Sequence, residues 1–260
     1  MDETIFMIHG MWVGPWFWDN YIDLFAQAGY HCVATTLRFH DMDPADAPDP
    51  RLGATSLLDY AEDLEQEIRA LGCQPIIMGH SMGGLLAQIM GSRGLAKALV
   101  LLGPAPPAGN RMLLQPSVMR SFWSGQTRWA FWRRPFRQTF EEAVYSMLHL
   151  LPIHEQRETY GRLVYESGRA ASEIGYWFLD PKRAAQVEES DMTCPVLVVG
   201  ASEDRITPVP IVRWVARQYK AVSTYKEFAN QAHWLVAQPG WPDVAEYVAS
   251  WLEGTLADIG

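Results

Sequence analysis

Short runs rich in apolar and β-branched residues recur along the first hundred residues of the chain and again after residue 190. Most of these runs lack an alternation of polar and apolar positions, which is typical of strands that are buried on both faces of a parallel sheet. The predicted strands are Thr4–Ile8, His31–Thr36, Pro75–Gly79, Lys97–Leu102, Pro195–Gly200 and Val222–Phe228.

Between these runs, apolar residues recur every three to four positions, the period of a helix with one buried face. Trp18, Tyr21, Ile22, Phe25 and Ala28 follow this pattern. Because right-handed crossovers place helices on both faces of a sheet, the alternation predicts a doubly wound, mainly parallel α/β fold. The predicted helices are Trp18–Ala28, Ser56–Leu71, Gly84–Met90, Pro208–Gln218 and Trp241–Leu252.

The alternation stops at Pro104 and resumes after Asp191. The residues between them show helical stretches that are broken by prolines and dense in aromatic residues, with no pattern that predicts a strand. We therefore predict an α/β core over residues 1–103 and 192–260, with a helical cap inserted at 104–191. Arg38–Gly53, with four aspartates and three prolines, is predicted to be a surface loop.

Composition narrows the class of protein. The chain has 260 residues, 48% of them hydrophobic, which is enough to bury a large core and excludes a disordered protein. Its net charge of −9 disfavours a nucleic-acid partner, since phosphate backbones are also negative. No apolar run is long enough to cross a bilayer, so we expect no membrane partner. The sequence leaves open whether the chain forms a homo-oligomer.

The cysteines and the start of the chain bear on its location. Cys32, Cys73 and Cys194 are odd in number and have no Cys-x-x-Cys spacing, which predicts free, buried thiols. The first residues, Met1-Asp2-Glu3, lack the basic start and the long apolar segment of a signal peptide. Both features predict a cytoplasmic protein.

Glycines surround a serine where the predicted strand Pro75–Gly79 meets the next helix. The segment reads Gly79-His80-Ser81-Met82-Gly83, with Gly84 directly after it. In a nucleophile elbow, glycines two residues to either side of a serine relieve the crowding of a sharp strand-to-helix turn. The same short pattern also occurs in ordinary tight turns, but its spacing fits neither a P-loop nor a dinucleotide-binding fingerprint. Ser81 is the candidate nucleophile.

A serine nucleophile needs a general base, and the chain has seven histidines. His149 and His154 are five residues apart, which places them on different sides of a helix and does not suggest a metal pair. His233 lies between the last predicted strand and the last predicted helix. His233 is therefore the candidate base, although its position alone also fits a surface-loop histidine.

The base needs a carboxylate to orient it. Asp204 follows the predicted strand Pro195–Gly200, and loops after parallel strands gather at the edge where active sites of such sheets lie. Asp204 is the candidate and Glu203 is its near rival. Either acid could instead cap the helix that follows.

Backbone amides could stabilise the negative charge that forms on the substrate. After the first predicted strand, Gly10 allows a tight turn that would aim the Met11 amide at the elbow. Together with the amide of Met82, it would form a two-donor oxyanion hole.

With these motifs in this order, the chain resembles the α/β-hydrolase fold family over nearly its whole length. The order Ser81, Asp204, His233 matches the order of nucleophile, acid and base in that family, and the predicted cap stands at the usual cap position. The segment His9-Gly10-Met11-Trp12 is similar to the oxyanion segment of the small serine esterases and the related hydroxynitrile lyases.

The resemblance implies a serine hydrolase that cleaves a small or medium carboxylic ester or lactone through an acyl-enzyme on Ser81, with no metal or organic cofactor. C–C bond cleavage or cyanohydrin lysis by the same triad, and a non-catalytic ligand receptor on this fold, remain alternatives. Trp12 and Trp234, beside the oxyanion segment and the base, are predicted to contact a small-molecule acyl substrate. Arg133, Arg134 and Arg137 are interpreted as solvated cap surface.

Overall fold

Six parallel strands form the central sheet of the computed structural model, which describes residues 3–110 and 115–259. The remaining residues of the predicted core and cap lie outside the described residues. The strand order is β2-β1-β3-β4-β7-β8, and every neighbouring pair is parallel. The bounds are β1 Thr4–Ile8, β2 His31–Ala34, β3 Ile76–His80, β4 Ala98–Leu102, β7 Val196–Ala201 and β8 Ser223–Phe228.

The core is centred on the four inner strands. Nearly all of their side chains are buried on both faces, as their continuous apolar runs predict. The edge strands β2 and β8 are only partly buried, because each has a neighbour on one side only. The predicted doubly wound, mainly parallel α/β class is confirmed.

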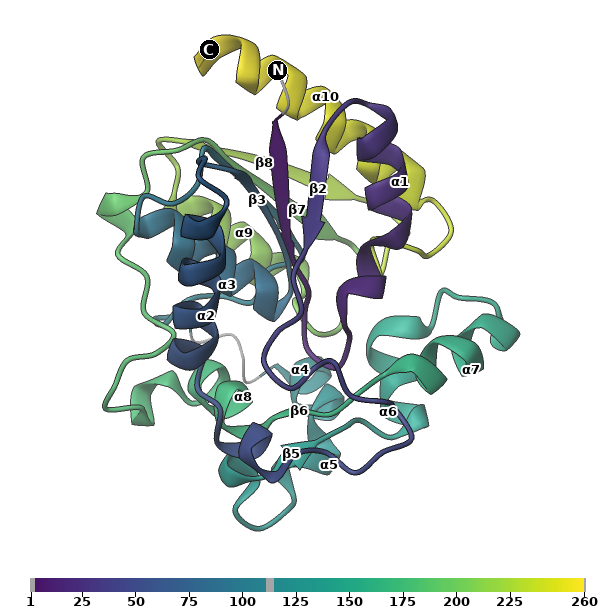
Figure 1. Cartoon of the computed structure of the whole chain (residues 1–260). Helices are drawn as coiled ribbons and strands as arrows, with labels where there is room; N and C mark the ends of the chain where they lie inside the picture. Colours follow the sequence, from purple (N-terminus) through teal and green to yellow (C-terminus); the bar gives the residue numbers. More distant parts are fainter. Residues whose placement is uncertain (1–2, 111–114, 260) are drawn as a thin grey trace.

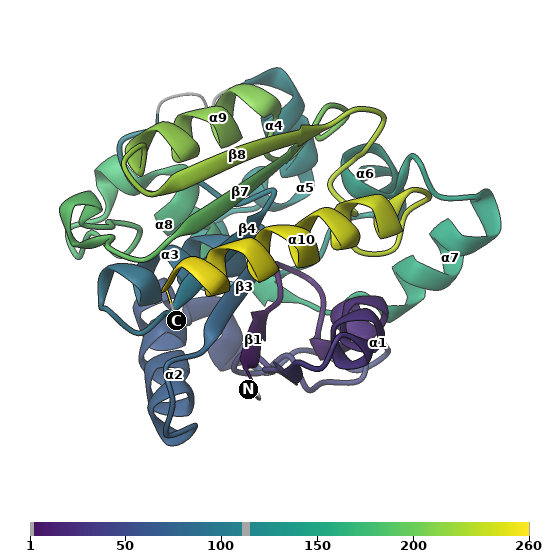
Figure 2. The ribbon, with the colours of Figure 1, turned by 90° about the horizontal axis from the view of Figure 1, so that it is seen from above.

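Helices cover both faces of this sheet. Figures 1 and 2 show α1 and α10 on one face and α2, α3 and α9 on the other. Their bounds lie close to the predictions, except that α10 runs seven residues further than predicted. The helices are α1 Asp19–Gln27, α2 Leu57–Ala70, α3 Met82–Ser92, α9 Val209–Gln218 and α10 Trp241–Ile259.

Local sequence explains where α1 and α2 begin and end. Ser56 caps α2 in a capping box with Asp59, and Gly29 and Gly72 follow α1 and α2 with positive φ angles of 90° and 70°. The predicted loop Arg38–Gly53 is largely irregular, but it runs into a short 3-10 helix, η2 (Pro50–Ala54). A second 3-10 helix, η1 (Pro15–Trp18), leads into α1.

The chain between β4 and β7 lies below the carboxyl ends of the strands in Figure 1. It is mostly short helices, but the prediction that it contains no strand is wrong: Pro135–Phe136 (β5) pairs antiparallel with Glu166–Ser167 (β6). Two-residue strands carry too few positions for a period of two to be visible. The helices are α4 Pro116–Ser121, α5 Trp123–Gln126, η4 Phe131–Arg133, α6 Phe140–Ala143, the π-helix η5 Val144–Leu148, α7 Ile153–Arg162, α8 Gly168–Gly175, η6 Trp177–Leu179 and η7 Glu189–Asp191.

The three cysteines are free, but the prediction that all are buried is wrong. Cys194 is buried, Cys32 is half-buried and Cys73 is exposed. Cys73 follows Gly72 in the loop between α2 and β3, where the chain turns at the surface. Among the described residues, no helix is both long enough and apolar enough to span a membrane.

Candidate active site

Ser81 sits in the turn from β3 to α3, in a strained backbone conformation. Its φ is 55° and its ψ is −120°, in a region that residues with a side chain rarely adopt. A side chain at Gly79 would collide with the backbone of Gly83, and one at Gly83 would collide with the carbonyl oxygen of Ile8. Glycine is therefore required at both positions, as predicted, because a side chain would not fit at either.

Asp204 lies in the loop after β7, and both oxygens of its carboxylate have hydrogen-bond donors beside them. Its Oδ1 accepts from the amides of Ile206 and Thr207, each at 2.8 Å, and its Oδ2 lies 2.8 Å from the Thr207 hydroxyl. Burial would raise the pKa of Asp204, but the charge and hydrogen bond of His233 and the bonds from Thr207 outweigh it and lower that pKa. Asp204 is therefore held as a carboxylate.

Of the two candidate acids, Asp204 is the one that lies beside His233. His233 donates from Nδ1 to Asp204 Oδ2 at 2.7 Å, and both side chains are buried. Glu203 is exposed, and its amide instead bonds the carbonyl oxygen of Gln231. Sequence reasoning did not assign a role to Thr207, whose hydroxyl and amide both hold the Asp204 carboxylate. The signal for it was Asp204-Arg205-Ile206-Thr207, an acid three residues before a threonine.

His80, inside the elbow, supports the loop that carries His233. Its ring lies 4.5 Å from the His233 ring, and its Nε2 donates to the His233 carbonyl oxygen at 2.9 Å. Burial and the neighbouring His233 lower the pKa of His80 well below its usual value, so it stays neutral.

Ser81 and His233 line one small cavity of about 10 Å³, together with Met11, Trp12 and Trp234. No hydrogen bond within the described part of the chain joins Ser81 to His233. Hydrogen bonds between nucleophile and base are often long without substrate and tighten when it binds. The structure thus brings the three predicted residues to one edge of the sheet, with the serine–imidazole contact open.

The backbone amides of Met11 and Met82 are free to donate hydrogen bonds to a negatively charged oxygen. Within the described residues, neither the Met11 nor the Met82 amide donates a hydrogen bond. The chain turns at Met11 and Trp12, directly after Gly10, as predicted. A Cβ at Gly10 would lie 3.0 Å from the Ser81 Cβ, so glycine also permits a close approach to Ser81. The residue with a left-handed conformation is Trp12, at φ 66°.

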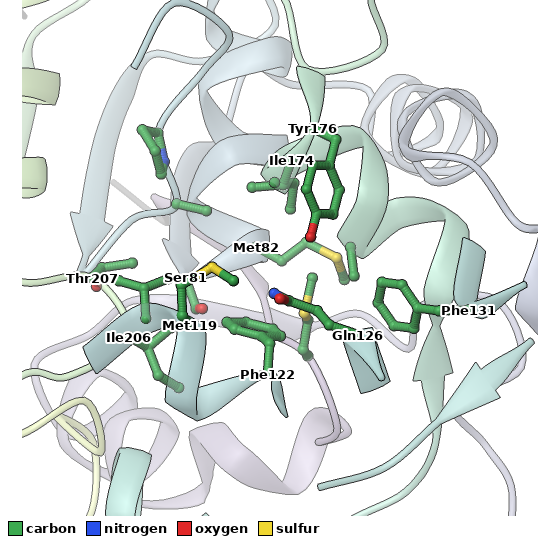
Figure 3. A pocket seen from close by; sticks show the side chains of 16 residues that line it. Ser81, Met82, Met119, Phe122, Gln126, Phe131, Ile174, Tyr176, Ile206 and Thr207 are labelled. Carbon is green, nitrogen blue, oxygen red and sulfur yellow. The ribbon is translucent and has the colours of Figure 1, made fainter. Parts of the chain in front are cut away.

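Ser81 and Met11 also line a second, larger cavity. It has a volume of about 60 Å³ and a mostly apolar lining (Figure 3). Most of that lining comes from the segment between β4 and β7, namely Ala105, Pro106, Val118, Met119, Phe122, Gln126, Phe131, Ala171, Ile174, Gly175 and Tyr176. Sequence analysis did not single out these residues, because nothing in their spacing distinguishes a cavity wall from the packing of a helical segment.

The two predicted substrate-contacting residues are buried. Trp12 and Trp234 are 2% and 3% exposed, and they line the small cavity beside His233 rather than the larger one. Arg133 and Arg134 are exposed, as predicted. Arg137 differs, since its guanidinium is partly buried and donates to the carbonyl oxygens of Pro44 and Tyr160.

The other histidines have structural partners or lie elsewhere. His9 donates to the Gly10 carbonyl oxygen and accepts from the Leu37 amide, and burial lowers its pKa to about 3. Among the described residues, no group of three or more His, Cys, Asp or Glu side chains could hold a metal ion.

Residues 5–242 match the model of the alpha/beta hydrolase family, so the chain belongs to that family. A search of curated proteins finds no significant relative.

Solved structures agree on the fold. Tomato methylketone synthase I, solved with 2-tridecanone, is 14% identical, with a TM-score of 0.72 over 98% of this chain and 99% of that one. A methylesterase from Arabidopsis and a polyneuridine aldehyde esterase are each 12% identical over 96% of this chain and 99% of theirs, with TM-scores of 0.70 and 0.71. At these identities the likeness concerns the fold.

Proposed function

We propose that this chain is a serine esterase that hydrolyses a carboxylic ester of a small alcohol through an acyl-enzyme on Ser81. The observation that carries the proposal is the 2.7 Å hydrogen bond from His233 Nδ1 to the buried carboxylate of Asp204. His233 and Ser81 line the same small cavity. This bond fixes the tautomer of His233 so that Nε2 is free to take a proton.

In the proposed reaction, His233 removes the proton of Ser81 as its oxygen attacks the acyl carbon. The oxyanion that forms is stabilised by the Met11 and Met82 amides, each worth on the order of 3 kcal/mol. His233 then gives its proton to the leaving alcohol, which departs. Water takes the place of the alcohol and loses a proton to His233 as it attacks the acyl group. His233 then returns this proton to the Ser81 oxygen as the bond to the acyl group breaks and the acid leaves.

The two cavities around Ser81 indicate how an ester would lie. His233 must reach the leaving oxygen to protonate it, and His233 lines only the small cavity. The alcohol therefore faces the small cavity and the acyl part faces the larger one. A cavity of about 10 Å³ has room for about one water, so it favours methanol as the alcohol and suits the water that follows. A lactone fits less well, since its leaving oxygen stays attached to the acyl chain.

Charge favours an ester over a carbon–carbon bond. An alkoxide can take a proton from His233 as it leaves, whereas a departing carbanion needs a cation or an electron sink beside it. Of the described residues that line the larger cavity, none is charged, and those of the small cavity include no acid, lysine or arginine.

The proposal is tested by release of acid from methyl butanoate at constant pH, together with labelling by a fluorophosphonate. The wild-type chain should hydrolyse the ester and carry the label on Ser81. Ser81→Ala should lose the label and activity on the order of 10⁶-fold, with its fold unchanged by circular dichroism. Ser190→Ala, at an exposed serine of η7 outside both cavities, is the matched control. Retained activity in Ser81→Ala, or no label on the wild type, would overturn the proposal.

A further inference from the structure

A third cavity adjoins the larger of the two cavities at Ser81, here called the inner cavity. This outer groove has a volume of about 530 Å³, against about 60 Å³ for the inner cavity. Small-molecule sites commonly span roughly 300–1,000 Å³, so the inner cavity alone is too small for a typical substrate and the outer groove is not. An acyl chain longer than the inner cavity therefore has to continue into other space.

Three residues belong to the walls of both spaces: Gln126, Phe131 and Tyr176. Gln126 ends α5, Phe131 begins η4 and Tyr176 follows α8, so the shared wall is built from three separate elements. In Figure 3, Ser81 lies at one end of the inner cavity and Phe131 at the other, with the side chains of Gln126 and Tyr176 reaching in between them.

Two of these three side chains are held by no hydrogen bond within the described residues. Phe131 is 6% exposed and packs edge-on against Phe136, with ring centroids 4.9 Å apart. Gln126 and Tyr176 are half-buried. Within the described residues, neither the Gln126 amide group nor the Tyr176 hydroxyl makes a hydrogen bond, so rotation about their side-chain bonds breaks none.

The chemistry of the two spaces suits one continuous apolar chain. The inner cavity is lined by methionine, phenylalanine, valine and isoleucine side chains. Beyond the shared wall, Trp132 and Leu179 are 48% and 71% exposed and line the outer groove. Its charged residues are already engaged, since Arg169 Nε donates to Glu173 at 2.7 Å and Asp180 accepts from the amides of Lys182 and Ala184.

This step rests on the ester hydrolysis proposed above. We infer that Gln126 and Tyr176 form a constriction where an acyl chain would pass from the inner cavity into the outer groove. The outer groove is the distal part of the acyl site, and the substrate class is esters of medium-chain to long-chain, unbranched acids. Tyr176 determines the chain length at which the acyl group meets the constriction. Its contribution is the bulk of its ring rather than its hydroxyl.

Chain-length profiles test this inference. We would measure kcat/KM for methyl esters of straight-chain acids from butanoate to dodecanoate with the wild type, Tyr176→Ala and Tyr176→Phe. Each methylene buried in the inner cavity should raise kcat/KM about fourfold until the chain reaches the constriction, where the wild-type profile levels. In Tyr176→Ala the rise should continue over at least two further methylenes, about tenfold or more on the longest esters. Tyr176→Phe should keep the wild-type profile.

Two further variants keep the test decisive. Trp123→Ala removes an exposed aromatic ring of α5, three residues from Gln126, that lines neither space, so its profile should match the wild type. Gln126→Ala should extend the profile in the same direction and replaces Tyr176→Ala if that variant is unstable.

The outcomes separate the two proposals. If methyl butanoate is hydrolysed and Ser81 is labelled, but the profiles of Tyr176→Ala and Gln126→Ala superimpose on the wild type, the constriction is wrong and the esterase proposal stands. If the wild type hydrolyses no ester of the series and Ser81 is not labelled, the esterase proposal itself fails, and the constriction with it.

Discussion

At the scale of single residues, the site combines strained and fully satisfied groups. Ser81 has a positive φ in a turn where no side chain would fit at the flanking Gly79 and Gly83. Asp204, by contrast, receives hydrogen bonds from two amides, a hydroxyl and an imidazole. The first arrangement exposes the nucleophile to the cavities, and the second keeps the carboxylate charged. A change at Asp204 should therefore act on His233 rather than on the fold.

Asp204→Asn should reduce kcat/KM for methyl butanoate by about 10⁴-fold, because an amide at this position favours the wrong tautomer of His233. Glu203→Gln is the matched control: it removes a neighbouring carboxylate that is exposed and lies away from His233, so its kcat/KM should stay within about twofold of the wild type. Steady-state rates of acid release give both values. Should Glu203→Gln lose the activity while Asp204→Asn keeps it, the acid has been assigned wrongly.

At the scale of elements, a buried carboxylate joins α8 to the start of α2. Glu173 accepts from the Leu57 amide at 2.8 Å and from the Ser56 hydroxyl, and Arg169 donates to it at 2.7 Å. A negative charge at a helix N-terminus is favourable, because the first amides of the helix have no partner inside the helix. The segment between β4 and β7 is thus attached to the core helix α2 by charge as well as by apolar packing.

Glu173→Gln should lower the free energy of unfolding by roughly 1.5–3 kcal/mol, since it removes the charge that α2 and Arg169 share. Urea denaturation followed by circular dichroism measures this difference. Glu158→Gln, at an exposed position of α7, is the control and should change stability by less than about 0.5 kcal/mol. Equal stability of the two variants would mean that Glu173 does not hold α8 to α2.

The elements also show what a sequence can predict. Inner strands such as Ile76–His80 lie within one residue of their predicted bounds, because both faces are buried and the whole run must be apolar. The elbow at Ser81 was visible because glycines are required at fixed offsets. The inner cavity was not predictable, because Gln126 and Tyr176 line it only through the packing of short, irregular helices, and the short pair β5–β6 has no sequence period.

At the scale of the whole molecule, a buried ion pair connects the loop after β2 to β6. His40 donates from Nδ1 to the Arg38 carbonyl oxygen and from Nε2 to Glu166, at 3.1 and 3.0 Å. An imidazole that donates from both nitrogens is protonated. Burial alone would lower the pKa of His40, but the charge and hydrogen bond of Glu166 outweigh it and raise that pKa. Glu166 also accepts from the Tyr60 hydroxyl, and the neutral His9 ring lies 5.1 Å from His40.

This pair predicts a pH dependence of stability with a definite sign. Because the folded-state pKa of His40 is above its unfolded value of about 6.5, the pair contributes fully below that pH. Its contribution is lost as the pH rises through the raised pKa. The wild type should exceed Glu166→Gln by roughly 1.5–3 kcal/mol in free energy of unfolding at pH 6, and the difference should shrink steadily towards pH 9. Urea denaturation of both proteins at each pH gives the difference. Since other titrating groups are common to both proteins, a difference that stayed constant from pH 6 to 9 would show that His40 is not charged in the folded chain.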